Sequence, residues 1–464
     1  MAVEDIHSFL QVLEKEGQLH KVHVEVNWDQ EVPAITDRVC KRPGGGPGLL
    51  FNRVVGYPTP VCTNLFGSSR RMRLALGNTD ADIFGNRLLS AMKGCPGSTS
   101  LQKLASLLER KEYQPQFQQN SPCQQRIVET EPDVGAYLPA LRTWPKDGGR
   151  YLTLPMVVTQ DPDSGVQNFG MYRVQLLGGN QLAIHWGPFS DGARHHQKNR
   201  NRGDKTPVAV VIGGPPALLY ASGAPVPAGV DEATFASFLL GKPVSMAKTL
   251  THGLAVPAGA DYVLEGYVEK DETVEEGPFG NHTGFYDPPK PAALFKVQTL
   301  TCRKDPVYVC TVVGPPPMEN SYMAQFSERL FLPLLQLDHP RVLEIHQPVE
   351  GIFHQCTFVS VKKDGPGQGK DVIRQLWDGP WLPRARLLAV FDEGTNLTES
   401  NGLLWHVLNR MTPASDLMVK GEQVGIDATS KVSGEDSFTP GRLPIVESPH
   451  IQQLLANRWA EYGL

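Results

Sequence analysis

Hydrophobic positions change their spacing along the chain, and the spacing predicts where helices give way to strands. Between Ile6 and Leu13 apolar residues recur at intervals of three and four, as on an amphipathic helix that Gly17 should end. From Tyr151 apolar residues alternate with other residues, as in half-buried strands. From about residue 320 helical and strand patterns alternate, with one strand expected at 342–346, which is typical of an α/β layer domain. Pro333 falls inside the first helical run, so we expect a kink or two short helices there.

A β-hairpin is predicted within residues 167–186. Two strand-like runs, 167–177 and 181–186, flank a turn that contains two glycines and Asn180. On a regular strand the side chains of Asn168 and Arg173 would point to opposite faces, because their separation is odd. If the two residues share a site, Gly170 should therefore mark a bulge or a bend.

The eleven residues from Glu276 to Tyr286 include three glycines, one proline and three aromatic residues, together with a carboxylate, an amide and an imidazole. The glycines and the proline argue against a regular helix or strand, so we expect a tight loop between two strands. Its polar side chains can hydrogen-bond or move protons. Taken alone, the segment is equally compatible with an ordinary decorated turn.

Composition narrows the class of protein. The 464 residues suffice for two or three domains, and 40% hydrophobic with 20% charged residues is ordinary for a globular protein. A net charge of −5 gives no reason to expect nucleic-acid binding. We expect no signal peptide and no membrane span. The seven cysteines form no CxxC pair, which favours reduced thiols in a cytoplasmic protein over a zinc-cysteine site.

The chain is predicted to divide into four parts. A polar, glutamine-rich stretch around residues 114–125 marks the first boundary. We expect an N-terminal α+β region at 1–115, a strand-rich central domain at 116–318, a C-terminal α/β domain at 319–445 and a last helix at 446–464. The apolar residues of that last helix suggest that it docks on a partner subunit.

Four short motifs follow one another along nearly the whole chain. They are Asn64-Leu65-Phe66-Gly67-Ser68 followed by Arg70-Arg71, Asn168 with Met171-Tyr172-Arg173, Glu276-Gly277-Pro278-Phe279-Gly280, and Ile426-Asp427-Ala428-Thr429. Each motif is weak alone, but the four in this order are specific. With them the chain resembles the UbiD family of reversible decarboxylases, which use prenylated FMN.

The resemblance implies a fold and a biological setting. The fold would be mixed α/β, with a split β-barrel that binds the flavin at 116–318, an N-terminal α+β region and a C-terminal α/β oligomerisation domain ending in an interface helix. The protein would be a cytoplasmic homodimer or hexamer. It would act on a small aromatic or heteroaromatic acid with release of CO₂, and a flavin prenyltransferase would supply its cofactor.

The resemblance also implies roles for individual residues. Arg173 and Glu276 resemble the catalytic pair of the family. Asn168, Glu232 and a histidine would hold a divalent ion, usually Mn²⁺, that clamps the cofactor phosphate, and K⁺ is implied as well. Oxygen ligands suit such an ion. His185 is preferred as the histidine, with His195 and His196 as rivals. The implied cofactor contacts are Asn168, Met171, Tyr172, Arg173, His185, Trp186 and Lys431.

In the implied mechanism the cofactor bonds to the substrate next to its carboxylate, CO₂ leaves, and a proton replaces it. Arg173 can hold the substrate carboxylate in fork geometry. It would also keep Glu276 ionised unless burial outweighs its charge.

One departure from the family concerns proton delivery. Many members carry Asp or Glu where this chain has Asn281, and a carboxamide cannot act as a general acid. His282 is the obvious substitute, alone or with Glu276, because imidazole has a suitable intrinsic pKa. In an extended segment side chains 281 and 282 would diverge, so only a turn could aim His282 inward.

The pair Asn281-His282 is similar to members that act on furan, pyrrole or indole carboxylates. Lys290 could hold the second carboxylate of a diacid, although a solvent-exposed lysine beside two prolines is the favoured interpretation. Two rival functions stay open: an FMN-binding split-barrel oxidoreductase that moves hydride, and a UbiD-like protein without decarboxylase activity, which Asn281 suggests.

Overall fold

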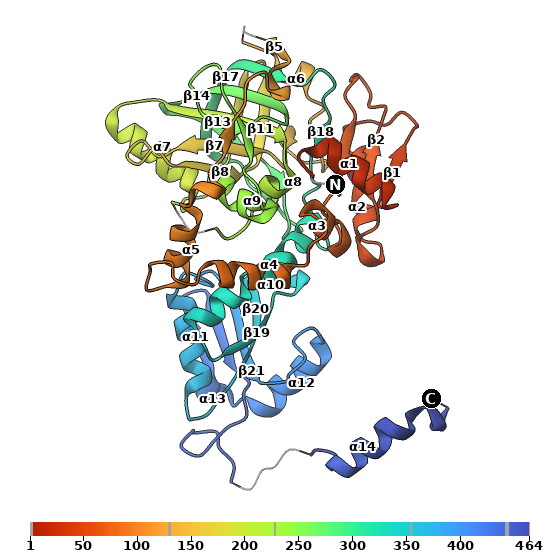
Figure 1. Ribbon diagram of the computed structural model, residues 1–464, viewed down its shortest axis with the longest axis vertical. Helices are drawn as coiled ribbons and strands as arrows, with labels where there is room; N and C mark the ends of the chain where they lie inside the picture. The colour runs from red at the N-terminus through yellow and green to blue at the C-terminus, as the bar shows by residue number, and fades with distance from the viewer. Residues whose placement is uncertain (1–2, 129–130, 227–228, 353–354, 441–444, 464) are drawn as a thin grey trace. The chain divides into compact units, whose positions relative to one another are not determined.

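The computed structural model describes residues 3–128, 131–226, 229–352, 355–440 and 445–463 (Figure 1). The chain forms two compact units, Met1–Phe358 and Val359–Leu464. The boundaries predicted at residues 115, 318 and 445 stay a prediction. No helix of the described ranges is both long and apolar enough to cross a membrane.

The first unit begins with the predicted amphipathic helix, α1 (Ile6–Lys15). The Asp5 carboxylate accepts a hydrogen bond from the Ser8 amide at 2.9 Å and so caps the helix, and the apolar side of α1 is buried. The helix leads into a sheet with the order β1-β2-β3-β18. Its strands are β1 (Leu19–Val22), β2 (Gly48–Phe51), β3 (Val61–Thr63) and β18 (Tyr308–Val309). Because β18 comes from far along the chain, it ties the N-terminal region to the centre of the unit.

Helices cover this region and connect it to the central sheet. The two that pack most closely are α4 (Ala81–Ala91) and α10 (Glu319–Asp338). A Cβ on Gly85 would lie 2.8 Å from the Leu330 carbonyl oxygen, so only glycine allows this approach. The sequence predicted a kink or two short helices at Pro333, but α10 is one helix across it. The other helices are α2 (Glu31–Cys40), α3 (Ser69–Ala75), α5 (Ser100–Leu108), α6 (Val134–Tyr137), α7 (Asp191–Arg202), α8 (Pro216–Ala221), α9 (Glu232–Leu240), η1 (Pro43–Gly45), η2 (Lys111–Tyr113), η3 (Pro122–Gln124) and η4 (Val349–Gly351).

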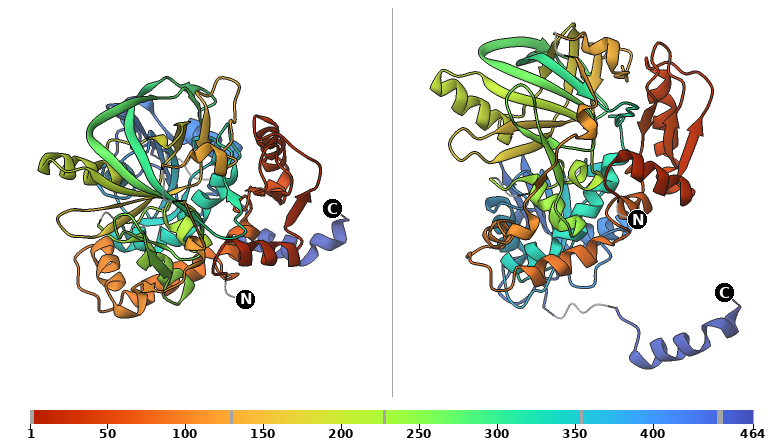
Figure 2. Two further views of the ribbon diagram at one scale, coloured as in Figure 1. Left: turned by 90° about the horizontal axis from the view of Figure 1, so that it is seen from above. Right: turned by 45° about the horizontal axis from the view of Figure 1, so that its top comes forward.

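The centre of the first unit is a curled sheet, which in the described residues has nine strands (Figures 1 and 2). The order along it is β6-β9-β10-β17-β14-β11-β7-β8, and β5 also pairs with β17. The strands are β5 (Arg126–Val128), β6 (Arg150–Leu152), β7 (Met156–Gln160), β8 (Gln167–Met171), β9 (Val174–Gly178), β10 (Gln181–Ile184), β11 (Thr206–Gly213), β14 (Ala260–Glu276) and β17 (Lys290–Cys302).

The long pair β14 and β17 explains the curl. Its register shifts between Glu265 and Gly266 and again between Val268 and Thr273. Such irregularities bend a strand and increase its twist. A Cβ on Gly266 would lie 2.0 Å from the Lys296 carbonyl oxygen, so the first irregularity requires glycine. Within the described residues no ladder joins β6 to β8, so the barrel is split. The mixed α/β architecture with a split β-barrel confirms the fold class predicted from the sequence.

The hairpin prediction is confirmed for β9 and β10, but the strand before it is interrupted. The run 167–177 was expected to be continuous, whereas β8 ends at Met171 and β9 begins at Val174. The pairing of β8 with β7 continues through Gly170 without a shift, so the bulge expected there is absent. The chain instead leaves the strand at Tyr172 and Arg173. Glycine is needed at 170 because a Cβ there would lie 2.2 Å from the Tyr172 ring.

Three smaller elements complete the first unit. β15 (Phe279–Gly280) and β16 (Tyr286–Asp287) form a two-stranded ladder, and β4 (Gln116–Phe117), β12 (Ser245–Lys248) and β13 (Ala255–Pro257) form a three-stranded sheet. β19 (Val342–His346) is the strand predicted at those residues.

The second unit alternates strands and helices, as predicted. β21 (Leu387–Asp392) pairs in parallel with β23 (Gln423–Asp427), which pairs antiparallel with β22 (Leu417–Lys420). The remaining elements are β20 (Cys356–Val361), which leads into the unit, and α11 (Gln368–Asp378), α12 (Ser400–Arg410), α13 (Pro413–Asp416), α14 (Pro449–Arg458) and η6 (Trp459–Tyr462). No residue of α14 is buried, so docking of this helix on a partner subunit stays a prediction.

Candidate active site

The centre of the candidate site is an ion pair between Arg173 and Glu276. Arg173 lies in the break between β8 and β9, and Glu276 is the last residue of β14. The Arg173 Nε and Nη2 groups donate to the two Glu276 carboxylate oxygens at 3.0 and 2.9 Å, which is bidentate geometry. The guanidinium carbon also lies 4.3 Å from the centre of the Phe279 ring. The pair expected from the sequence is therefore assembled.

Glu276 is fully buried, and its environment keeps it ionised. Burial by itself would raise the pKa of this carboxyl group, but hydrogen bonds with His185 and Arg173 and their charges outweigh it and lower the pKa to about 2. The His185 Nδ1 atom lies 3.3 Å from a Glu276 oxygen. At Glu276 the interactions with His185 and Arg173 together therefore prevail over burial.

A second carboxylate, which the sequence reasoning missed, lies on the other side of the guanidinium. Asp287 in β16 accepts a hydrogen bond from the Arg173 Nη1 group at 2.9 Å. Its other oxygen accepts from the Asn281 side-chain amide at 2.6 Å. The signal for Asp287 was present in the sequence: Phe279-Gly280 and Tyr286-Asp287 flank a glycine-containing five-residue loop, which is a hairpin pattern. Closing this hairpin places Asp287 directly across from Phe279.

The loop between β15 and β16 is tightly fixed. The Asn281 carbonyl accepts from the Gly284 amide at 3.2 Å, and Gly284 has a φ of +81° that favours glycine. At the base of the loop Asp147 accepts from the Gly280 amide at 2.8 Å. A Cβ on Gly280 would lie 2.4 Å from the Trp144 ring, so the indole packs directly on the backbone. The glycines expected to shape this loop do so at these two positions.

His282 lies in the turn and faces the first turn of α10. Its Nε2 atom accepts a hydrogen bond from the Asn320 side-chain amide. Burial lowers the pKa of His282, the positive charge of Arg173 lowers it further, and the result is about 4. The imidazole is therefore neutral at pH 7, with its proton on Nδ1. The catalytic role predicted for His282 stays a prediction.

A second polar cluster lies where β8 meets the start of α9. Glu232, in the first turn of α9, accepts a hydrogen bond from the Phe169 amide at 2.7 Å and so lies beside Asn168. Burial raises the pKa of Glu232 to about 8 despite this hydrogen bond. The side-chain nitrogens of Asn168 and Trp186 are buried and make no well-formed hydrogen bond to the described residues, although the Asn168 nitrogen lies near the Tyr172 hydroxyl group. Buried donors of this kind suit a bound group rich in acceptor atoms.

Comparison with protein families covers almost the whole chain. Residues 10–108, 116–316 and 321–437 match the N-terminal, Rift-related and C-terminal domains of 3-octaprenyl-4-hydroxybenzoate carboxy-lyase. The chain belongs to the UbiD family. The resemblance noted from the four sequence motifs is confirmed, and with it the enzyme class of carboxy-lyase.

Relatives and solved structures agree with this assignment. An uncharacterized protein of Aquifex aeolicus is 38% identical, over 99% of both chains. A dimeric, evolved form of the UbiD-class enzyme HmfF from Pelotomaculum thermopropionicum, solved with prFMN, is 26% identical, with a TM-score of 0.80 over 98% of this chain and 99% of that one. The vanillic acid decarboxylase of Sedimentibacter hydroxybenzoicus shares the fold at 24% identity and a TM-score of 0.86, over 99% and 98% of the chains.

The histidines proposed as metal ligands in this UbiD protein have other partners. His185 lies on Glu276, while the Nδ1 atoms of His195 and His196 each lie 2.9 Å from a threonine hydroxyl. In the described part of the chain no three or more His, Cys, Asp or Glu side chains gather as a metal site. Asn168 belongs to none of these residue types, so its pairing with Glu232 as metal ligands stays a prediction.

The remaining predicted contacts differ in their surroundings. Lys290 lies directly across the ladder from Glu276, so both side chains share one face. Met171 is half-buried and packs near Gly223. Lys431 belongs to the second unit, where its ammonium group lies 3.2 Å from Asp427 and 3.3 Å from Asp416. Contacts of these residues with a cofactor or a substrate stay predictions.

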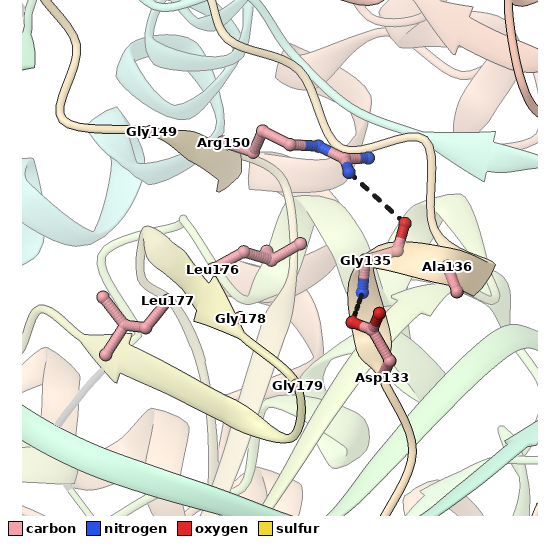
Figure 3. A pocket seen from close by; sticks show the side chains of 9 residues that line it. All are labelled: Asp133, Gly135, Ala136, Gly149, Arg150, Leu176, Leu177, Gly178 and Gly179. Carbon is pink, nitrogen blue, oxygen red and sulfur yellow. Dashed lines mark hydrogen bonds between the residues drawn. The ribbon is translucent and has the colours of Figure 1, made fainter.

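A cavity of about 430 Å³ lies apart from these residues (Figure 3). Arg150 is the cation on its wall. The guanidinium donates to the backbone carbonyls of Ala140 at 2.9 Å, Leu138 at 2.6 Å and Gly135 at 3.3 Å, so it stabilises the chain around the cavity. The cavity is lined by Asp133, Gly135, Ala136, Gly149, Arg150, Leu176, Leu177, Gly178 and Gly179, none of which was predicted as a site residue.

Proposed function

We propose that this protein is a prenylated-FMN-dependent, non-oxidative and reversible decarboxylase of an aromatic or heteroaromatic carboxylic acid. The observation that carries the proposal is the arrangement of Arg173. Three of the five N–H donors of its guanidinium bind Glu276 and Asp287, and the other two have no partner among the described residues. A fixed guanidinium with donors to spare is suited to a substrate carboxylate.

The residues around Asn168 fit the cofactor that this function requires. The unpaired donors of Asn168 and Trp186 suit the acceptor atoms of a flavin phosphate or ring. The oxygens of Asn168 and Glu232 suit Mn²⁺, and a cation beside Glu232 would offset the burial that raises its pKa. We propose Met171, Tyr172, Trp186 and His185 as further contacts and K⁺ as a second ion. The related enzyme HmfF was solved with prFMN.

When bound, prenylated FMN would supply the carbon that bonds to the substrate and the ring system that accepts the electrons left by CO₂. The protein orients the substrate and moves a proton. Arg173 holds the substrate carboxylate through its remaining donors, and Glu276 stays ionised and fixes the plane of the guanidinium. The Phe279 ring covers one face of that plane and keeps water away from it. Burial strengthens these charge interactions.

Two features support a heteroaromatic acid as the substrate. The first is the pair Asn281-His282, in which Asn281 is engaged with Asp287 and His282 is neutral. The second is Lys290, which shares a face with Glu276 and is half-buried. We propose furan, pyrrole or indole carboxylates, with Lys290 as a contact for the second carboxylate of a diacid. We further propose a cytoplasmic homodimer or hexamer that receives its cofactor from a flavin prenyltransferase.

Co-expression with a flavin prenyltransferase tests the proposal. The purified protein should show the absorption spectrum of prenylated FMN, and it should exchange ring hydrogen of furan, pyrrole or indole for deuterium in D₂O when CO₂ is present. Arg173→Ala should abolish the exchange while the spectrum remains. Loaded protein that exchanges no hydrogen with any of these compounds would contradict the proposal, and reduction of ordinary FMN by a nicotinamide would favour the oxidoreductase instead.

A further inference from the structure

The two carboxylates that flank Arg173 are held unequally. Glu276 is fully buried, takes two N–H donors of the guanidinium and touches His185. Asp287 takes one N–H donor, and its side chain is 31% exposed. Its other oxygen accepts from the amide of Asn281. Of the two, Asp287 is the carboxylate that is held less tightly by the arginine and is open to solvent.

The net charge of the cluster formed by Arg173, Glu276 and Asp287 affects how an anionic ligand can bind. Two carboxylates face one guanidinium, so a substrate carboxylate would bring a third negative charge to the same cation. Negative charges that share one cation in a partly buried site repel one another, and this repulsion opposes binding of a carboxylate ligand. Within the described residues Lys290 forms no ion pair with either carboxylate, although it shares a face with Glu276. The other titratable groups that face the cluster are His185, His282 and Tyr151, and Asp147 lies next to Tyr151.

We propose that Asp287 takes up a proton when a carboxylate ligand binds to Arg173, and that this proton replaces the departing carboxylate in the reaction. The first half concerns binding alone, and the second half rests on the proposed function. Because Oδ1 of Asp287 accepts from Asn281, the proton enters on Oδ2, the atom that now faces Arg173. The guanidinium then gains a free donor for the ligand.

The proton balance is simple. In the reaction the C–C bond to the carboxylate breaks and CO₂ leaves. The O–H bond of Asp287 then breaks, its proton forms a C–H bond at the carbon that lost CO₂, and Asp287 returns to Arg173 as a carboxylate. His282 is less suited to this task because its Nε2 atom already accepts from Asn320. Asn281 need not be an acid, since its amide positions the acid instead.

Calorimetry tests the proton uptake without turnover. Furan-2-carboxylate is titrated into the full-length protein loaded with ordinary FMN, at pH 7, in buffers of different ionisation enthalpy. The dependence of the binding enthalpy on the buffer should give an uptake of about one proton per ligand. Asp287→Asn should bind the ligand with uptake near zero, and Asp287→Glu should restore it. The control Asp82→Asn removes an aspartate that pairs with Arg329 instead, and it should behave like the original chain.

Several results would overturn the inference. These are no binding of furan-2-carboxylate, binding without proton uptake, or the same uptake in Asp287→Asn. Loss of uptake in His282→Gln but not in Asp287→Asn would assign the proton to His282. The proposed function fails separately: proton uptake that depends on Asp287, in a protein that releases no CO₂ with prenylated FMN, would leave the binding half in place and remove the decarboxylase. Furan-2-carboxamide, which lacks the charge, should bind without proton uptake.

Discussion

Replacing Glu276 by glutamine tests the electrostatic argument most sharply. Glutamine keeps the shape of the side chain but removes the charge that binds Arg173. Each pKa unit corresponds to about 1.4 kcal/mol. A carboxyl group whose pKa falls from 4.5 to about 2 on folding therefore stabilises the protein by about 3 kcal/mol at neutral pH. Breaking one side of a buried ion pair costs a similar amount, about 3–5 kcal/mol.

The pH dependence has a definite sign. Because folding lowers the pKa of Glu276, the stabilisation is complete above about pH 4.5 and is lost as the pH falls toward 2. Glu276→Gln should therefore melt several degrees below the original chain at pH 7, and this difference should narrow at lower pH. Glu275→Gln is the matched control, because Glu275 is the preceding residue of β14 and is exposed. Equal melting temperatures for Glu276→Gln and Glu275→Gln at pH 7 would show that the charge of Glu276 does not stabilise the fold.

Three further predictions concern binding and turnover. His282→Ala should still bind cofactor and should keep more product formation than Asp287→Asn, as followed by the flavin spectrum and CO₂ release, because the proton comes from Asp287. A larger loss in His282→Ala than in Asp287→Asn would return the proton to His282. Asn168→Ala and Trp186→Phe each remove an unpaired buried donor, so each should weaken FMN binding roughly tenfold in a fluorescence titration. Unchanged affinity in both variants would show that neither donor binds the flavin. Lys290→Met should raise KM for a furan dicarboxylate but not for a monocarboxylate. Equal effects on both substrates would show that Lys290 does not contact the second carboxylate.

Local patterns predicted the regular elements well. The spacing between Ile6 and Leu13 predicted α1, because helical packing requires that spacing. The two glycines before Asn180 predicted the β9–β10 hairpin, since the turn needs positive φ angles. The motifs also supplied Arg173 and Glu276 as a pair, and the structure brings them together.

The errors arose where tertiary contacts override local patterns. The break after Met171 depends on the Tyr172 ring folding over Gly170, which no alternation pattern reveals. Pro333 stays inside one helix because α10 packs along α4. Asp287 was missed because its approach to Arg173 depends on the closure of the β15–β16 hairpin. Charge pairs between distant segments leave no periodic signal in the sequence.

Release of CO₂ from a panel of aryl and heteroaryl acids is the most direct test of the central claim. The protein is loaded with prenylated FMN, and Arg173→Ala loaded in the same way serves as the control. At least one acid of the furan, pyrrole or indole type should be consumed with release of an equal amount of CO₂, and Arg173→Ala should release none. Fully loaded protein that releases CO₂ from no acid, or an Arg173→Ala variant as active as the original chain, would contradict it.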